Sequence, residues 1–163
     1  PPRSTLFPYT TLFRSQVWHP AARLVWVGDG PSARKLAQDH PDQYFAGMRI
    51  GEDLAAHYAS ADFFLFPSLS ETYSNVVAEA MASGVPVLAY RSAAAAELVV
   101  DADNGRVVAP GDEKAFVEAA LWALEDGERL RRMGVQARSA MLSRGWPDVV
   151  VSFERAVSEA LAG

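Results

Sequence analysis

Cysteine is absent from this 163-residue sequence, and histidine occurs only three times, at scattered positions. Without thiols the chain has neither a disulfide framework nor a thiolate metal site. His19, His40 and His57 lack the spacing of metal ligands, so we expect no metal ion. No apolar run approaches the roughly 18 residues of a membrane-spanning helix. These absences favour a cytoplasmic domain, either free or peripheral at the inner face of a membrane.

An excess of basic residues is also missing. The chain has 15 Lys and Arg against 20 Asp and Glu, a formal net charge of −5. Nucleic-acid-binding domains usually carry a basic stripe, so we expect no nucleic-acid partner. Apolar residues make up 50% of the sequence, which is enough for a packed core and too much for disorder. The length favours one domain.

Strand and helix patterns alternate along the chain. Short apolar runs bounded by Gly or Pro predict strands, and longer segments with helical spacing and capping residues predict helices. The expected strands lie within residues 22–31, 44–47, 62–68, 86–90 and 104–109. The expected helices lie within 32–40 (with Ser32 as N-cap), 51–61, 74–84, 93–99, 111–126, 128–145 and 146–163. Continuous apolar strands such as "LVWV" and "FFLF" indicate a doubly wound α/β fold, with a parallel sheet covered on both faces.

Two carboxylates flank the start of one predicted helix. Ligands of doubly wound sheets bind beyond the carboxyl ends of the strands, where Glu71 follows a strand. Glu79 lies eight residues later in an otherwise apolar helix, where we expect it to be buried, and a buried carboxylate needs a partner. The free N–H groups at the helix start can bind an anion, and carboxylates can accept hydroxyls. Alternatively, Glu79 pairs with Arg91 and Glu71 is a solvated loop residue.

The turn "GDGPSA", from Gly28 to Ala33, fits the loose dinucleotide pattern G-x-G-x-x-G/A. The acidic residue expected about 20 positions later to bind ribose is missing, and Pro31 removes an N–H. The glycines therefore favour either a tight turn or close approach by a flat base. Arg49, after the second predicted strand, either reaches a base or phosphate or is a solvated surface residue.

The stretch "FFLFPSLSETYSNVVAEAMASGVPVLAY" resembles the signature of glycosyltransferase family 4, retaining enzymes of the GT-B fold. Its hallmark is Glu, seven residues and Glu, here Glu71 and Glu79, followed by "GVPV" at 84–87. The segments "VGDGP", "FAGMRIGEDLAAHYASADFFLFPS" and "NGRVVAPGDEKAF" match in order. The resemblance runs from about Arg23 to Leu124 and implies that residues 16–163 form the C-terminal, nucleotide-sugar-binding domain.

The resemblance also implies roles for individual residues. Glu79 would hold the ribose hydroxyls, and Glu71 would be the catalytic residue facing the sugar at the reacting centre. The remaining donor-binding positions are backbone N–H groups for the sugar (Tyr73, Ser74, Asn75), backbone N–H groups for a phosphate (Val76, Val77), glycines that shape the pocket (Gly28, Gly30) and residues that border the base (Met48, Arg49). The family usually has the residues E-G-F-G at the first acid of the motif. This sequence has Thr72 and Ser74 in place of the two glycines, and these residues do not readily adopt positive φ.

The details of these motifs look most like bacterial GDP-mannose-dependent mannosyltransferases. That likeness implies retaining transfer of mannose to a lipid or glycan acceptor, without a metal ion or other cofactor. A UDP-sugar-dependent enzyme of the same family and an NAD-binding oxidoreductase domain are the alternatives.

The segment "TLFPYTTLFRS", residues 5–15, resembles a translated sequencing adaptor. We therefore expect residues 1–15 to be non-native and the first strand of the domain, its basic phosphate-binding loop and the acceptor-binding N-terminal domain to be missing. In the strand order 3-2-1-4-5-6 the first strand is central. Its loss would leave neighbouring strands with unpaired edges, and the chain alone would be unstable and inactive.

Overall fold

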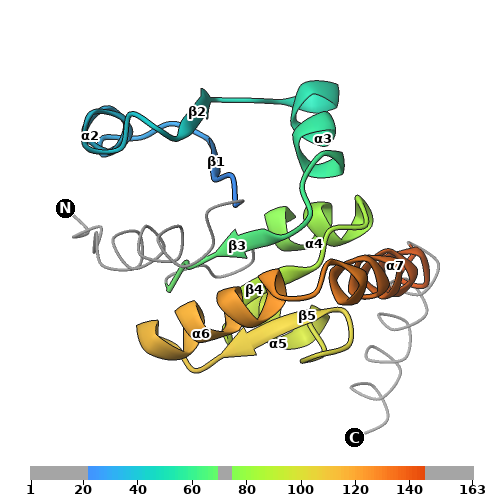
Figure 1. The fold of residues 1–163 in the computed structure, drawn as a ribbon. Coiled ribbons are helices and arrows are strands. Elements are labelled where there is room, and N and C mark those ends of the chain that lie inside the picture. The colour runs from blue at the N-terminus through green and yellow to red at the C-terminus, as the bar shows by residue number, and fades with distance from the viewer. Residues whose placement is uncertain (1–21, 70–74, 146–163) are drawn as a thin grey trace, which may run out of the picture.

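The computed structural model describes residues 22–69 and 75–145, within which strands and helices alternate as predicted (Figure 1). The strands are β1 (Val25–Val27), β2 (Tyr44–Gly47), β3 (Phe64–Phe66), β4 (Val87–Tyr90) and β5 (Gly105–Val108). The helices are α2 (Ala33–Asp39), α3 (Gly51–Ala59), α4 (Asn75–Ala82), α5 (Ala93–Leu98), α6 (Glu113–Leu124) and α7 (Gly127–Leu142). The helix predicted for 146–163 lies outside the described residues.

The strands form two parallel sheets, one of β1 and β2 and one in the order β3-β4-β5. The first sheet pairs Val25 with Tyr44, and the second pairs Phe64 with Val87. Within the described residues, β1 and β3 each have a strand on one side only. The expected order 3-2-1-4-5-6 places its central strand between these two edges. Figure 1 shows β1 and β2 apart from the other three strands, with α3 connecting the two groups.

The best-covered strand is β4, in which every side chain is buried. Val87 and Ala89 point to one face, into a cluster that includes residues of α4, α5 and α7. Leu88 and Tyr90 point to the other face, where they pack with Phe116 and other residues of α6. Burying an aliphatic side chain completely stabilises the folded chain by about 1.5–3 kcal/mol relative to leaving it exposed. The prediction of a sheet covered on both faces is therefore confirmed for this strand.

The prediction of a buried first strand is wrong in part. β1 forms, but the side chains of Val25 and Val27 are 53% and 42% exposed. Alternate residues of a strand point to the same face, and no described element covers the face to which these two valines point. Trp26 on the opposite face stacks on Phe45 at 5.8 Å between ring centroids, and its Nε1 donates to Gln43.

Two predicted helix starts differ in how they are capped. Ser32 precedes α2 as predicted, but its backbone is already helical and its side chain makes no capping hydrogen bond. Asp112 precedes α6 and accepts a hydrogen bond from the N–H of Ala115 at 2.9 Å. A side-chain oxygen at this position satisfies one of the free N–H groups of the first turn. Only the second arrangement stabilises its helix through a side chain.

Candidate functional site

The predicted donor-binding residues that the structure describes follow β1, β2 and β3 at the carboxyl ends of these strands. In parallel sheets these ends meet at one edge, which is where ligands bind in doubly wound folds. The N–H of Gly28 donates to the carbonyl of Gly47 at 2.9 Å, so the turn after β1 is joined to the loop after β2. The structure thus brings Gly28 beside the loop that carries Met48 and Arg49.

The two glycines of the first turn are not equivalent. Gly28 has a φ of +123°, a backbone conformation that side chains rarely adopt, although a Cβ there would have no atom within 4 Å. Gly30 does not have such a φ, and its N–H donates to the Asp29 carboxylate at 2.7 Å. The backbone conformation therefore requires glycine at position 28 and not at position 30.

The loop after β2 presents an exposed apolar surface beside a paired cation. Met48 is 66% exposed, and Ile50 is 77% exposed. Arg49 lies between them, and its Nη1 donates to Oδ2 of Asp53 at 3.0 Å, in the first turn of α3. The Arg49 side chain is about one-third exposed, and its Nε is buried without a hydrogen-bond partner. Arg49 is therefore held by α3 rather than freely solvated, with one N–H group still unpaired.

Helix α4 carries the predicted phosphate-binding residues. The side chain of Val77 is fully buried, whereas that of Asn75 is exposed. A buried side chain at position 77 leaves only the backbone N–H for a ligand. Three other predicted site residues, Glu71, Tyr73 and Ser74, lie outside the described residues.

The prediction that Glu79 is buried is wrong. The buried residues of α4 are Val77, Ala80 and Met81, whereas Glu79 is exposed on the same face as Asn75. The cause is that a helix of small residues can still be one-sided, because residues four apart share a face. The ion pairs among the described residues do not include one between Glu79 and Arg91.

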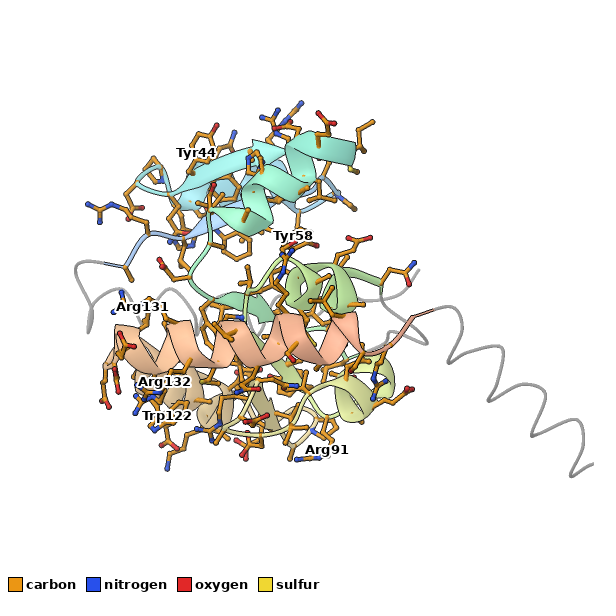
Figure 2. All side chains as sticks on the ribbon, turned by 90° about the vertical axis from the view of Figure 1, so that its right-hand side faces the viewer. Tyr44, Tyr58, Arg91, Trp122, Arg131 and Arg132 are labelled. Atoms are coloured by element: carbon orange, nitrogen blue, oxygen red, sulfur yellow. The ribbon has the colours of Figure 1, made fainter. Side chains whose placement is uncertain are left out.

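The charge of Glu79 acts on Tyr58, a residue that the sequence analysis did not select. The side chain of Tyr58 is only 8% exposed, and its ring meets Phe64 of β3 edge-on at 5.5 Å between centroids. Figure 2 shows Tyr58 between the ribbons of α3 and α4. Burial, and after it the nearby negative charge of Glu79, raises the pKa of Tyr58 to about 12.

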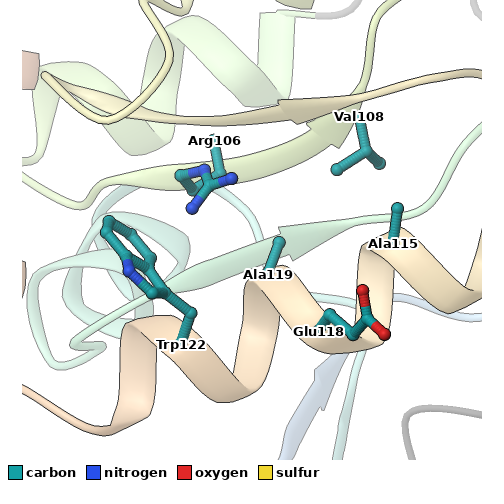
Figure 3. A pocket seen from close by; sticks show the side chains of 6 residues that line it. All are labelled: Arg106, Val108, Ala115, Glu118, Ala119 and Trp122. Atoms are coloured by element: carbon teal, nitrogen blue, oxygen red, sulfur yellow. The ribbon is translucent and has the colours of Figure 1, made fainter.

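A separate pocket of about 370 Å³ lies between β5 and α6 (Figure 3). Trp122 forms one end of it, with the guanidinium of Arg106 at 4.4 Å and that of Arg129 at 3.8 Å from its ring centroid. Arg106 is also paired with Asp101 at 2.8 Å. This pocket contains no predicted donor-binding residue, and its strand, β5, is at the far edge of the sheet from β3.

The described residues contain neither a metal-ligand cluster nor a membrane-spanning helix. Residues 22–69 and 75–145 contain no group of three or more His, Cys, Asp or Glu side chains that could hold a metal ion. In the same ranges, every helix is too short or too polar to cross a membrane.

The parallel sheets, the Gly28 turn and the helix after β3 define a doubly wound α/β domain with its ligand edge at the carboxyl ends of the strands. Residues 11–126 match the model of the family described as Glycosyl transferases group 1. The chain belongs to this family. The matched region begins within the segment that resembles an adaptor and includes every predicted site residue.

The curated relatives of this chain include two mannosyltransferases. Over 127 residues the chain is 41% identical to a GDP-mannose-dependent alpha-mannosyltransferase of Mycolicibacterium smegmatis, covering 78% of this chain and 33% of the relative. A protein of the same description from Corynebacterium glutamicum is 38% identical over 125 residues, covering 76% and 30%. The matched stretch is therefore about one third of the length of these relatives.

Solved structures support the fold. The sucrose-phosphate synthase of Thermosynechococcus elongatus superimposes with a TM-score of 0.75 and 26% identity. The alignment covers 93% of this chain and 42% of that structure. The predicted fold class, the Rossmann-like half of a GT-B glycosyltransferase, is confirmed.

Proposed function

We propose that this chain is the donor-binding half of a retaining glycosyltransferase that transfers mannose from GDP-mannose to a lipid or glycan acceptor. The observation that carries the proposal is the position of Glu79, an exposed carboxylate on a helix whose other face is buried. It follows the strand β3, at the end of the sheet where ligands of this fold bind. The printed descriptions of two relatives support GDP-mannose as the donor.

The Glu79 carboxylate accepts hydrogen bonds from the two ribose hydroxyls of the nucleotide in this proposal. A carboxylate has about four acceptor positions, so its two oxygens can serve both hydroxyls of a vicinal diol. Gly28 and Gly30 shape the nucleotide pocket, because the turn after β1 lies against the loop after β2. Met48 and Arg49 border the base, for which an exposed thioether and a planar guanidinium offer a stacking surface.

The start of α4 binds the diphosphate and the sugar in this proposal. The backbone N–H groups of Val76 and Val77 face the phosphate, where the positive end of the helix dipole favours negative charge. The same groups stabilise the charge that develops on the leaving diphosphate. The backbone N–H groups of Tyr73, Ser74 and Asn75 contact sugar hydroxyls, and Glu71 faces the sugar at the reacting centre.

The acceptor is proposed to bind residues outside this chain. The relatives are about three times as long as the stretch that they share with it. Sites of two-domain enzymes commonly lie between the domains. The chain by itself is then a nucleotide-sugar-binding unit, and transfer needs the remainder of such an enzyme.

The test titrates the full-length protein with GDP, UDP and NAD and measures the binding of each by calorimetry. We expect GDP to bind most tightly and NAD not to bind. Tighter binding of UDP would instead indicate a UDP-sugar donor. The E79A variant should weaken GDP binding about tenfold or more, the usual effect of removing hydrogen bonds to a charged group. E118A, which removes an exposed carboxylate on α6, is the control. Unchanged GDP affinity in E79A would refute the role of Glu79.

A further inference from the structure

Positive charge is concentrated on α7. Residues 129–145 contain five arginines and neither Asp nor Glu, although the whole chain has a formal net charge of −5. The five are Arg129, Arg131, Arg132, Arg138 and Arg144. A chain with net negative charge can attract a negatively charged partner only where its cations are gathered together. Helix α7 has such a gathering of cations.

Two aliphatic side chains are also exposed on this helix. Val135 is 68% exposed and Leu142 is 75% exposed, whereas the other strongly exposed large hydrophobic residues of ranges 22–69 and 75–145 lie in strands or loops. The two residues are seven positions apart, about two helical turns, so they share one face. Leu130, Met133 and Ala137 are buried on the opposite face. Val135 and Leu142 therefore point away from the core.

Arginines lie on both sides of this aliphatic pair. Helical spacing places Arg132 on one side of Val135 and Arg138 on the other, and all three side chains are exposed. Figure 2 shows α7 across the front of the molecule, with Arg131 and Arg132 on opposite sides of its ribbon. The surface that α7 turns away from the core thus has an apolar centre with cations beside it.

Two of these cations have no acidic partner. Arg131 pairs with Glu128 at 2.7 Å. The ion pairs of the described residues include neither Arg132 nor Arg138. Arg138 donates to the carbonyl of Ala82 at 3.1 Å, and a neutral acceptor leaves its positive charge in place. The surface therefore has a net positive charge that an anionic partner can compensate.

We propose that the outer face of α7, formed by Arg131, Arg132, Val135, Arg138 and Leu142, docks on an anionic lipid surface. The arginines reach the headgroups with their long side chains, and the two aliphatic side chains lie at the boundary of the acyl region. Two such side chains bury little area, so the arginines supply most of the attraction. This proposal does not depend on the identity of the sugar donor.

A second copy of the chain fits this face less well than a lipid surface. A twofold contact pairs a patch with the same patch on the partner, which would bring the arginines of both copies together. Like charges in a contact weaken it. A lipid surface supplies the opposite charge, and being fluid it follows a convex helix without a matching groove.

The test measures cosedimentation of the full-length protein with lipid vesicles. The probes are vesicles of phosphatidylcholine with about 30% phosphatidylglycerol and vesicles of phosphatidylcholine alone. We expect binding to the anionic vesicles only. The affinity should fall at least about tenfold between about 0.05 and 0.5 M salt, because salt screens charges at the surface. Equal binding to both kinds of vesicle, or binding to neither, would overturn the proposal.

Matched variants test whether the contact lies on α7. R132Q and V135S/L142S change the outer face at exposed positions, and each should weaken binding to the anionic vesicles about fivefold or more. R34Q, at an exposed arginine of α2, and V100S, at an exposed valine outside α7, are the controls and should bind like wild type. Unchanged binding in either face variant, or an equal loss in the controls, would overturn the proposal. A dimer that V135S/L142S dissociates would assign the face to a second copy instead.

Discussion

Gly134 of α7 lies so close to Gly84, in the turn after α4, that a Cβ on Gly134 would be 2.3 Å from the Gly84 carbonyl oxygen. Gly84 has a φ of +81°, which ends α4 and turns its carbonyl towards α7. Nearby, the guanidinium of Arg138 donates to the carbonyl of Ala82 at 3.1 Å. The end of the helix that carries Glu79 is thus held by α7.

Replacing Gly134 should loosen this contact. In G134A the new methyl group meets backbone atoms that cannot rotate away, so we expect the free energy of unfolding to fall by at least about 2 kcal/mol. G127A is the matched control, because it is in the same helix and has no atom within 4 Å of its Cβ position. Alanine favours helix, so G127A should be neutral or up to about 1 kcal/mol more stable. Equal urea midpoints for the two variants would contradict the close packing.

The Gly28 turn gives a second paired prediction. G28A forces a side chain into a φ of +123°, which we expect to cost about 1–3 kcal/mol of stability and to weaken GDP binding by displacing the turn. G30A has no such backbone requirement and should change stability by less than about 1 kcal/mol. Thermal unfolding and GDP titration of both variants provide the measurement. Tolerance of alanine at position 28 would show that the turn adopts another conformation in solution.

The ionisation of Tyr58 predicts a loss of stability at high pH. Below pH 10, Tyr58 is protonated in both the folded and the unfolded chain, so it adds no pH dependence. Between pH 10 and about 12 the unfolded chain loses this proton while the folded chain keeps it, and stability falls as pH rises. The total change is up to about 2–3 kcal/mol.

Urea unfolding of wild type and Y58F from pH 9 to 12 measures this change. The wild-type curve should fall more steeply than the Y58F curve between pH 10 and 12. Burial also raises the pKa of Tyr90, but Tyr90 is present in both proteins and cancels in the difference. Parallel curves would mean that Tyr58 ionises normally.

The capping residue of α6 gives a prediction on stability alone. D112A removes the acceptor of the Ala115 N–H and should lower the free energy of unfolding by about 0.5–2 kcal/mol. S32A is the control, because Ser32 makes no side-chain cap at α2. GDP affinity should be unchanged in both variants. A similar loss of stability in S32A would mean that Ser32 caps α2 in solution.

The order of strands and helices was predictable because each element has a local signature. Gly84 and Pro86 end α4 and open β4, and the Asp112 cap precedes an apolar helical stripe. These signals depend on residues a few positions apart, which the sequence lists directly. The family was predictable for the same reason, since Glu71, Glu79 and "GVPV" lie within one short stretch.

The exposure of particular side chains was not predictable from such patterns. Val25 and Val27 belong to a run that reads as a buried strand, yet no described element covers them. Glu79 lies among apolar residues in sequence, yet it is on the exposed face of α4. Burial depends on which elements pack against a face, and that is decided by contacts between segments distant in the chain.

The sequence by itself determined the alternation of elements, the family and the two carboxylates of the motif, because all of these are local patterns. The tertiary structure alone decided that Tyr58 of α3 is buried in one cluster with Val77 and Met81 of α4. It also decided that Gly134 needs to lack a side chain against Gly84. In both cases the physical reason is that close packing acts between atoms that the fold brings together.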